Sequence, residues 1–230
     1  MSLTLAFDVY GTLIDTQGVL VGLQQYVGEK APEFSRTWRD KQLEYSFRRG
    51  LMQRYENFAV CTRDALEYTC EFLAVDLGRA EKDALMDLYK VLPAFADAAV
   101  GLERAKAAGL SLFAFSNGSA AAVEGLLNHA GIRALFDGVV STDEIQSFKP
   151  NPAVYRHFLQ RADTAADRAW LVSGNPFDVI GAVGAGMRAA WVRRSPAAVF
   201  DPWDVQPTVT VEGLADIAGV VAGLGGSRVG

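Results

Sequence analysis

Asp8 and the residues just after it have the types and spacing best suited to chemistry at an active-site edge. Asp8 follows the apolar run Leu3-Thr4-Leu5-Ala6-Phe7, and a buried strand of this kind delivers its last side chains to the edge where ligands bind. Gly11 permits a tight turn after the strand, and Thr12 offers a hydroxyl and an amide beside the acid. Taken alone, Asp8 could equally be a strand-end residue that caps a helix.

Three later loops carry polar groups in comparable positions. Ser116-Asn117-Gly118-Ser119 follows the predicted strand Leu110–Phe115, and its amides would lie at a helix N-terminus, a natural seat for an anion. In Phe148-Lys149-Pro150, one lysine lies next to a proline that restricts the backbone. Ser173-Gly174-Asn175-Pro176-Phe177-Asp178 follows another buried strand and supplies a hydroxyl, an amide and a carboxylate. Each loop alone could be an ordinary turn, a helix cap or an exposed lysine. Because all of them occupy comparable positions among the predicted strands, together they indicate a functional site.

Length and composition exclude several functional classes. With 230 residues, half of them apolar, the chain can bury a sizeable core. A net charge of −5 argues against a dedicated nucleic-acid binder, which needs clustered Lys and Arg. The sequence contains no apolar run long enough to span a membrane and shows no secretory leader, so we expect a cytoplasmic protein.

The cysteines and histidines do not point to a redox, zinc or triad site. Cys61 and Cys70 fall in one predicted helix, where a rise of about 1.5 Å per residue separates them by roughly 13 Å, beyond disulfide reach. Both are interpreted as buried small hydrophobes. His129 and His157 stand apart from any cysteine or histidine cluster and are expected at a helix end or on the surface.

The order of predicted elements indicates an interrupted α/β chain. After the first strand, a section without convincing strands shows helical periodicity and is punctuated by glycine. Its predicted helices are Gln17–Val27, Pro32–Gly50, Asn57–Asp76 and Arg79–Lys90. Beyond Pro93, helices and strands alternate. The predicted helices are Asp97–Ala108, Ser119–Ala130, Pro152–Arg161 and Asp178–Ala185, and the strands are Leu110–Phe115, Gly138–Val140, Ala169–Val172, Ala189–Val192 and Thr208–Val211.

This order predicts a Rossmann-like parallel sheet that is covered by helices on both faces, with an inserted helical-bundle cap. The predicted core comprises residues 1–15 and 96–230, and the predicted cap residues 16–95. A glycine-rich tail over 223–230 is expected to fray. Because ligands bind outside the carboxyl ends of parallel strands, the four polar loops should meet at one edge of the sheet.

The loops, taken in order, resemble the motifs of the haloacid dehalogenase superfamily, whose first aspartate is a covalent nucleophile. The resemblance covers nearly the whole chain and is strongest to the (S)-2-haloacid dehalogenases, also called L-2-haloacid or type II. They share Asp-x-Tyr-Gly-Thr (Asp8 to Thr12), Ser-Asn-Gly-Ser, Lys-Pro and a Ser-x-Asn-x-aromatic-Asp segment. Phosphatases of the superfamily carry a second aspartate where this chain has Tyr10. A phenol, with a pKa of roughly 10, cannot replace that acid near neutral pH.

The cap sequence resembles the same family. Trp38-Arg39-Asp40-Lys41-Gln42-Leu43-Glu44-Tyr45 and Arg54-Tyr55-x-Asn57-Phe58 match its cap pattern, in which the first arginine reaches the active site. Without the resemblance, Arg39 would be interpreted as a solvated helix residue. Two positions depart from the pattern: Asp40 stands where some relatives have Gln, and Gly174 replaces a frequent Ser. Asp40 could reduce the positive field of Arg39 at a leaving group and so change the substrate preference.

The resemblance implies a role for each motif residue. Asp8 would attack C2 of a 2-haloalkanoate from the side opposite the halogen and form an ester. The implied catalytic residues are Asp8, Thr12, Arg39, Lys149, Ser173, Asn175 and Asp178. Lys149 would keep the carboxylates ionised, and Asp178 would orient water, with Thr12, Ser173 and Asn175 around it. Arg39, Asn117 and Phe177 would stabilise the departing halide. Ser116 would hold the substrate carboxylate, and Tyr10, Leu43 and Phe58 would form an apolar wall.

The expected function is therefore metal-independent hydrolysis of an (S)-2-haloacid to an (R)-2-hydroxy acid, with no cofactor and no metal site. A 2-haloacid is the expected small-molecule partner, a homodimer is possible, and neither nucleic acid nor membrane is expected. A related enzyme that opens a strained 2-carboxylated ring, such as azetidine-2-carboxylate, would have nearly the same sequence. A phosphatase would need a magnesium site and an acid in place of Tyr10. A non-catalytic binding protein is disfavoured because no catalytic position is missing.

Overall fold

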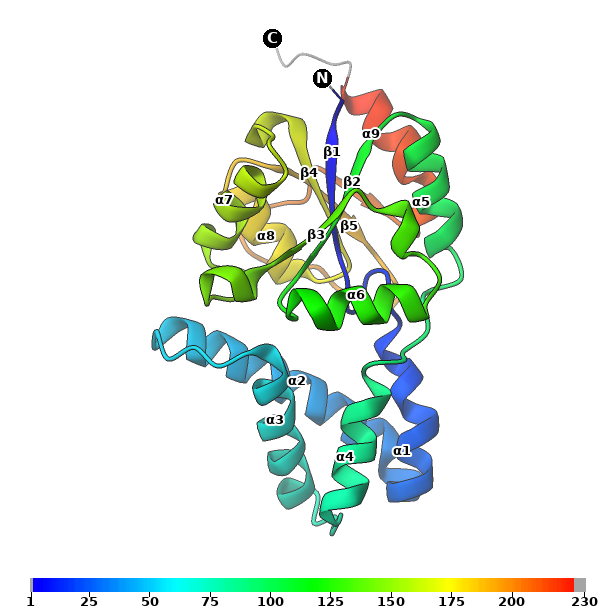
Figure 1. Cartoon of the computed structure of the whole chain (residues 1–230), viewed down its shortest axis with the longest axis vertical. Coiled ribbons are helices and arrows are strands. Elements are labelled where there is room, and N and C mark those ends of the chain that lie inside the picture. Colours follow the sequence, from blue (N-terminus) through cyan, green and yellow to red (C-terminus); the bar gives the residue numbers. More distant parts are fainter. Residues whose placement is uncertain (1, 226–230) are drawn as a thin grey trace.

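Six parallel strands form one sheet at the centre of the protein (Figure 1). The structure is a computed structural model that describes residues 2–225. The strands are β1 (Thr4–Asp8), β2 (Ser111–Ser116), β3 (Gly138–Ser141), β4 (Ala169–Ser173), β5 (Arg188–Val192) and β6 (Val209–Val211). Their order is β3-β2-β1-β4-β5-β6, so β1 lies between β2 and β4. The order reverses beside β1, and ligands bind at such a switch point. Asp8, the last residue of β1, lies there, in register with Phe115.

Helices cover both faces of the sheet, as the apolar strands require. On β1, Leu5 and Phe7 pack in one hydrophobic cluster and Ala6 in another, because successive side chains of a strand point to opposite faces. Helices α5 (Ala98–Ala107), α6 (Ala120–His129) and α9 (Ile217–Gly225) contribute to the first cluster, and α7 (Pro152–Arg161) and α8 (Pro176–Gly184) to the second. The predicted α/β fold with a parallel sheet is confirmed.

Four helices from the section between β1 and β2 group beside the carboxyl ends of the strands (Figure 1). They are α1 (Val19–Val27), α2 (Ala31–Leu51), α3 (Phe58–Phe72) and α4 (Arg79–Leu88), and we call them the cap. Trp38 lies at the centre of the cap: its ring packs edge-on against Tyr89 with centroids 4.9 Å apart, and its indole N–H donates to the carbonyl of Thr62. The exact division into residues 1–15 with 96–230 and residues 16–95 stays a proposal.

The two segments that connect the cap to the sheet lie side by side. The amide of Asp15 donates to the carbonyl of Pro93 at 2.8 Å, and the amide of Phe95 donates to the carbonyl of Leu13 at 2.9 Å. These backbone hydrogen bonds begin a few residues after Asp8. They therefore fix where the cap emerges relative to the nucleophile loop.

Several predicted helix ends were wrong. The helix predicted from Gln17 begins at Val19, because Thr16–Gly18 form a 3₁₀ turn in which the amide of Gln17 donates to the side chain of Asp15. The helix predicted to Asp76 ends at Phe72, since the chain turns at Ala74 with a φ of +50°. The helix predicted from Asp178 begins at Pro176, a residue type well suited to the first turn. Asp178 therefore lies in that first turn rather than before it.

The C-terminal part contains a helix that the sequence analysis did not predict. Helix α9 follows β6 and places Ile217 and Val221 against the sheet. Residues 223–225 of the predicted frayed tail belong to this helix, and residues 226–230 lie outside the described part. Short 3₁₀ segments connect other elements: Thr16–Gly18, Gly28–Lys30, Arg133–Leu135, Thr142–Ile145, Ala166–Arg168 and Leu214–Asp216.

The cysteines and His129 lie where the sequence predicted, whereas His157 lies within α7, away from its ends, with its side chain 14% exposed. Cys61 and Cys70 are buried on α3 and are not bonded to each other. His129 is the last residue of α6, and His157 on α7 contacts Glu144. Within residues 2–225, none of the helices combines the length and the apolar character that a membrane span requires.

Candidate active site

A buried lysine bridges two carboxylates at the carboxyl ends of β1 and β4. Lys149 is 1% exposed, and its Nζ lies 3.0 Å from Oδ1 of Asp8 and 2.8 Å from Oδ2 of Asp178. It also donates to the carbonyl of Phe115 at 2.8 Å, which employs all three N–H groups of an ammonium. Burial alone would lower the pKa of Lys149, but the carboxylates of Asp178 and Asp8 outweigh it and raise that pKa. Lys149 is therefore a cation.

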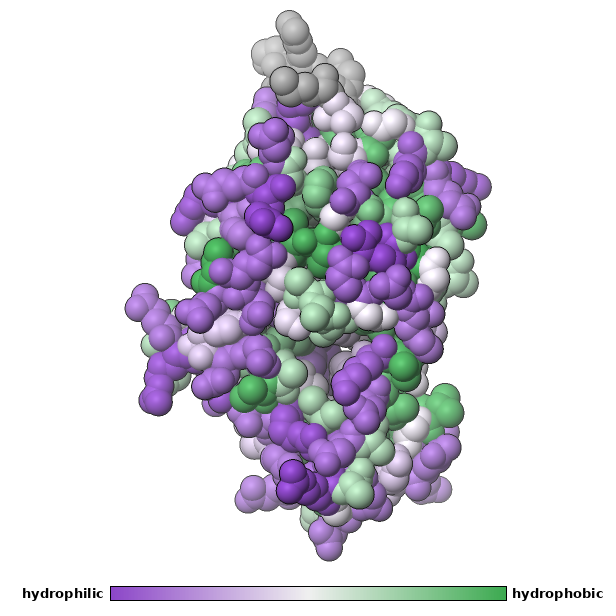
Figure 2. All heavy atoms as spheres, in the orientation of Figure 1, coloured by the Kyte–Doolittle hydropathy of each residue, from purple (hydrophilic) through white to green (hydrophobic). Residues whose placement is uncertain are grey.

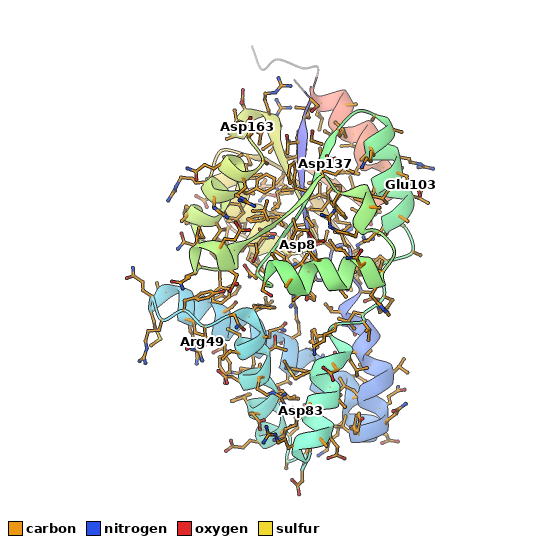
Figure 3. All side chains as sticks on the ribbon, in the orientation of Figure 1. Asp8, Arg49, Asp83, Glu103, Asp137 and Asp163 are labelled. Atoms are coloured by element: carbon orange, nitrogen blue, oxygen red, sulfur yellow. The ribbon has the colours of Figure 1, made fainter. Side chains whose placement is uncertain are left out.

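The second oxygen of Asp8 is held by two neutral donors. Thr12 Oγ1 donates to Oδ2 of Asp8 at 2.7 Å, and Asn175 Nδ2 donates to the same oxygen at 2.8 Å. Thr12 Oγ1 in turn accepts from the amide of Gly174 at 2.8 Å. The tight turn at Gly11, which has a φ of +83°, brings Thr12 back towards the acid. Asp8 is thus fixed through both oxygens. Figure 3 labels Asp8, the last residue of β1.

Asp178 is buried in the first turn of α8 and is held by a residue that the sequence analysis missed. Tyr155 on α7 donates its hydroxyl to Oδ1 of Asp178 at 2.8 Å. Burial, reinforced by the Asp178 carboxylate, raises the pKa of Tyr155 well above its ordinary value, so the hydroxyl remains a donor. Burial also raises the pKa of Asp178, against the opposing charge of Lys149. Gly181 makes room for this contact, since a Cβ there would lie 2.3 Å from the Tyr155 hydroxyl oxygen.

The Ser116–Ser119 loop lies beside Lys149, as predicted. Asn117 accepts from the backbone amide of Lys149 at 2.9 Å and from the hydroxyl of Thr142 at 3.3 Å, both through Oδ1. Its Nδ2 has no acceptor among residues 2–225 and remains available to an anion. Ser116 is buried and accepts from the amide of Gly118 at 3.1 Å. Ser119 caps the first turn of α6. The loop therefore leads into a helix N-terminus, where backbone N–H groups can bind an anion.

Ser173 and Gly174 shape the loop after β4. Ser173 is buried, and its Oγ accepts from the amide of Asn175 at 3.1 Å, which orients the asparagine towards Asp8. A Cβ at Gly174 would lie 2.4 Å from the carbonyl oxygen of Gly11. In this chain, glycine at 174 therefore lets the two loops approach each other closely.

The predicted apolar residues lie between cap and core. The rings of Tyr10 and Phe58 are 6.3 Å apart, and Phe177 packs edge-on against Phe47 of α2 at 5.1 Å. Phe47 was not predicted. Leu43 is half-buried on α2. The structure therefore brings Tyr10, Phe58 and Phe177 to the boundary between the two parts, and the role of Leu43 stays a prediction.

Arg39 is half-buried on α2 and acts electrostatically on the nucleophile loop. Burial raises the pKa of Tyr10 and of Tyr89 to about 12 each, and the charge of Arg39 lowers both by a smaller amount. The Tyr10 phenol is therefore neutral near pH 7. Asp40 was expected to reduce the positive field of Arg39, but no contact between the two side chains supports this. Asp40 is exposed, and within the described residues it makes no ion pair with Arg39. Adjacent residues on a helix do not face each other.

Gln42 holds Arg39 in place, and the sequence analysis did not identify it. Its side chain is 1% exposed; Oε1 accepts from Nη1 of Arg39 at 2.6 Å, and Nε2 donates to Thr62 Oγ1 at 2.6 Å. Thr62 donates onward to the carbonyl of Phe58 at 2.8 Å. The contact could have been expected from the sequence, because residues at i and i+3 on a helix, such as Arg39 and Gln42, are neighbours on its surface.

No group of three or more His, Cys, Asp and Glu side chains that could hold a metal ion occurs in the described part of the chain. The Asp8 and Asp178 carboxylates instead share the ammonium of Lys149. Together with Thr12 and Asn175, this arrangement holds the Asp8 carboxylate through both oxygens beside a positive charge.

A family model described as haloacid dehalogenase-like hydrolase matches residues 5–192. The chain is 36% identical over 214 residues to an (S)-2-haloacid dehalogenase of Pseudomonas putida, which covers 93% of this chain and 94% of the relative. It is 37% identical over 212 residues to an (S)-2-haloacid dehalogenase of Pseudomonas fluorescens, covering 92% and 93%.

The fold is also shared with a solved relative. The L-2-haloacid dehalogenase from Xanthobacter autotrophicus with chloropropionic acid covalently bound is 30% identical and has a TM-score of 0.91, over 97% of this chain and 100% of that one. The fold, the family model and the full-length relatives all indicate the same family. The chain therefore belongs to the (S)-2-haloacid dehalogenases, within the haloacid dehalogenase-like hydrolases.

Proposed function

We propose that this protein hydrolyses (S)-2-haloalkanoic acids to (R)-2-hydroxy acids and halide through a covalent ester on Asp8. One observation carries the proposal: the Asp8 carboxylate is paired with a buried ammonium at one oxygen and held by Thr12 and Asn175 at the other. Such a carboxylate is fixed in orientation beside a positive charge, as a covalent nucleophile requires. The covalently bound chloropropionic acid in the Xanthobacter relative supports the same chemistry.

The first step uses the less engaged oxygen of Asp8. Within the described residues, Oδ1 accepts one hydrogen bond, from Lys149, whereas Oδ2 accepts two. Oδ1 therefore has a lone pair for attack on C2 from the side opposite the halogen. The new Oδ1–C2 bond forms as the C2–halogen bond breaks, and the halide leaves with the electron pair. This displacement inverts C2.

The second step hydrolyses the ester at Cγ. Asp178, whose pKa is raised by burial, takes a proton from water as the oxygen attacks Cγ. Thr12 and Asn175 stabilise the negative charge that develops on Oδ2. The Cγ–Oδ1 bond then breaks; the alkoxide takes a proton from Lys149, and Asp178 returns its proton to Lys149 at 2.8 Å. Asp8, left as the acid, releases its proton to solvent.

Substrate binding follows from the neighbouring loops. The substrate carboxylate binds Ser116 and the adjacent amides at the start of α6, where an anion is favoured. The halide leaves towards Asn117, Arg39 and Phe177, with the free Nδ2 of Asn117 as a donor. Tyr10, Leu43 and Phe58 form the apolar wall. A homodimer and a cytoplasmic location stay predictions.

Chelation should leave the reaction unchanged, because Lys149 already compensates the charge between Asp8 and Asp178. The measurement is halide release from 2-chloropropionate with and without EDTA. We also expect poor hydrolysis of aryl phosphates, since the Tyr10 phenol is neutral near pH 7 and cannot replace a carboxylic acid. Recovery of activity on adding magnesium after EDTA treatment would contradict the proposal.

Arg39→Ala should lower kcat by about a hundredfold, equivalent to about 3 kcal/mol, if the guanidinium stabilises the departing halide. The loss should be larger for 2-chloropropionate than for the bromo and iodo compounds, because chloride is the poorer leaving group. Arg36→Ala, an exposed position on the same helix, is the matched control and should retain kcat. Asp40→Asn should change kcat by no more than a few fold, because Asp40 is exposed and screened by water. Equal kcat for Arg39→Ala and the unmodified protein would make Arg39 an ordinary helix residue.

A further inference from the structure

An arginine after β5 holds the backbone of the loop that follows Asp8. Nε of Arg194 donates to the carbonyl of Thr12 at 3.2 Å, and Nη2 of Arg194 donates to the same oxygen. Among residues 2–225, no other group donates to that carbonyl. Thr12 is fully buried, so the carbonyl would be left without a donor if the guanidinium were removed.

The guanidinium of Arg194 is itself fixed by Asp97, the residue before α5. Nη1 of Arg194 lies 2.8 Å from each carboxylate oxygen of Asp97, and Oδ2 of Asp97 also accepts from the amide of Leu214 at 2.6 Å. The guanidinium lies over the ring of Phe95, 4.0 Å from its centroid. A planar group with several N–H donors can bind the carboxylate and the Thr12 carbonyl at once, whereas a lysine ammonium cannot reproduce that fork.

These contacts join the loop after β1 to the linker that returns from the cap. Phe95 and Asp97 lie at the end of that linker, and the amide of Phe95 donates to the carbonyl of Leu13, the residue after Thr12. The surface is hollowed where the cap meets the rest of the molecule (Figure 2). Arg194 therefore fixes Thr12 at the point where the chain leaves the sheet for the cap.

The side chain of Thr12 contacts the nucleophile directly. Its Oγ1 donates to Oδ2 of Asp8 at 2.7 Å. Arg194 forms no hydrogen bond or ion pair with Asp8, Lys149 or Asp178 within the described residues. Any effect of Arg194 on the reaction must therefore pass through the position of Thr12.

We infer that Arg194, held by Asp97, is a positioning residue for hydrolysis of the ester on Asp8, because it fixes the backbone of the residue whose hydroxyl binds Oδ2. The inference rests on the proposed function and deepens it. Arg194 orients the donor that stabilises the charge formed in the second chemical step.

The two chemical steps depend differently on this donor. In the first step, Asp8 loses its negative charge as Oδ1 bonds to C2, so a donor to Oδ2 stabilises the starting carboxylate at least as well as the transition state. In the second step, water attacks Cγ and negative charge develops on Oδ2, so the same donor stabilises the transition state. Misplacing Thr12 should slow hydrolysis of the ester and leave its formation nearly unchanged.

The test measures the two steps separately in Arg194→Met. At saturating (S)-2-bromopropionate, the ratio of esterified to unesterified protein equals the ratio of the rate constants for ester formation and ester hydrolysis. Mass analysis of quenched protein should show this ratio raised at least about tenfold, because outright removal of such a donor costs about 10²–10³-fold. Rapid-quench halide release in the first turnover should stay within about threefold of the unmodified protein, since the donor does not favour that transition state.

A purely structural role would not produce this result, because unfolded protein cannot form the ester and would lower the ratio. An unchanged ratio, or equal losses in both steps, would overturn the inference. By contrast, the proposed function would be overturned if the unmodified protein released no halide, or if it released halide without any ester on Asp8.

Two further variants complete the test. Arg193→Met is the matched control: Arg193 precedes Arg194, pairs with Glu212 and does not contact Thr12 within the described residues, so the ratio should stay unchanged. Arg194→Lys keeps a charge to pair with Asp97, which supports the fold, but loses the fork that reaches the Thr12 carbonyl. We expect folded Arg194→Lys to raise the ratio at least about threefold, because Thr12 is again misplaced. An unchanged ratio in this variant would also overturn the inference.

Discussion

Asp8→Asn should lower halide release by more than about 10⁴-fold and leave the protein folded, since loss of a covalent nucleophile removes the reaction path itself. An amide of the same shape cannot form the ester. Asp8 also repels the buried Asp178, so its neutralisation leaves Lys149 paired with one carboxylate, and we expect the thermal unfolding midpoint to stay close to that of the unmodified protein. Halide release and the unfolding midpoint are the two measurements.

The covalent step has its own test in heavy-oxygen water. In a single turnover with enzyme in excess, water attacks Cγ of the ester, so the heavy oxygen should enter Asp8 and the product hydroxyl should come from Oδ1. Peptide mass analysis of the Asp8 segment and of the hydroxy acid distinguishes the two. Heavy oxygen in the hydroxy acid, with none in the protein, would show direct attack of water on C2 and exclude the ester. Asn175→Asp is unsuitable as a control for the labelling experiment, because it puts a further carboxylate next to Oδ2 of Asp8.

Lys149→Met should destabilise the protein by about 3–5 kcal/mol, because it leaves two buried carboxylates without a counter-charge. Asp178 is fully buried and Asp8 is 7% exposed, so water cannot replace the ammonium fully. Halide release should fall with the stability, since Asp8 would lose the ammonium that contacts its Oδ1. The free energy of unfolding from urea titration and the rate of halide release are the measurements.

Two further variants identify the cause of that loss. In Lys149→Met with Asp178→Asn, one uncompensated charge is also removed, so part of the lost stability should return. Lys82→Met, which breaks the pair with the half-exposed Glu67 on the cap, should cost less than about 1 kcal/mol. If Lys149→Met were as stable as Lys82→Met, the bridge between Asp8 and Asp178 would contribute little to stability and our account of the site would be wrong.

The sequence alone predicted the elements that deliver the motif residues. The run Leu3–Phe7 predicted a buried strand ending at Asp8, and the alternation after Pro93 predicted the parallel sheet. Because parallel strands end at the same edge, the loops carrying Ser116, Lys149 and Asp178 could be expected to meet there. Local pattern determines these features: apolar runs, glycines and helix caps act within a few residues along the chain.

Contacts between distant residues were not predictable in this way. The Tyr155 hydroxyl reaches Asp178 only because α7 packs on α8 at Gly181, and nothing in the pattern of α7 distinguishes this tyrosine from a core residue. Gln42 meets Thr62 because α2 lies against α3. Helix α9 was missed, although its apolar residues complete one face of the sheet.

The contact of Tyr10 with Phe58 likewise depends on how the cap meets the sheet, which no segment of the sequence encodes separately. The sequence determined which residues could react and on which elements they lie, because propensity and periodicity are local. Only the tertiary structure decided which oxygen of Asp8 accepts fewer hydrogen bonds and what holds Arg39, because these depend on side-chain packing between elements far apart in the chain.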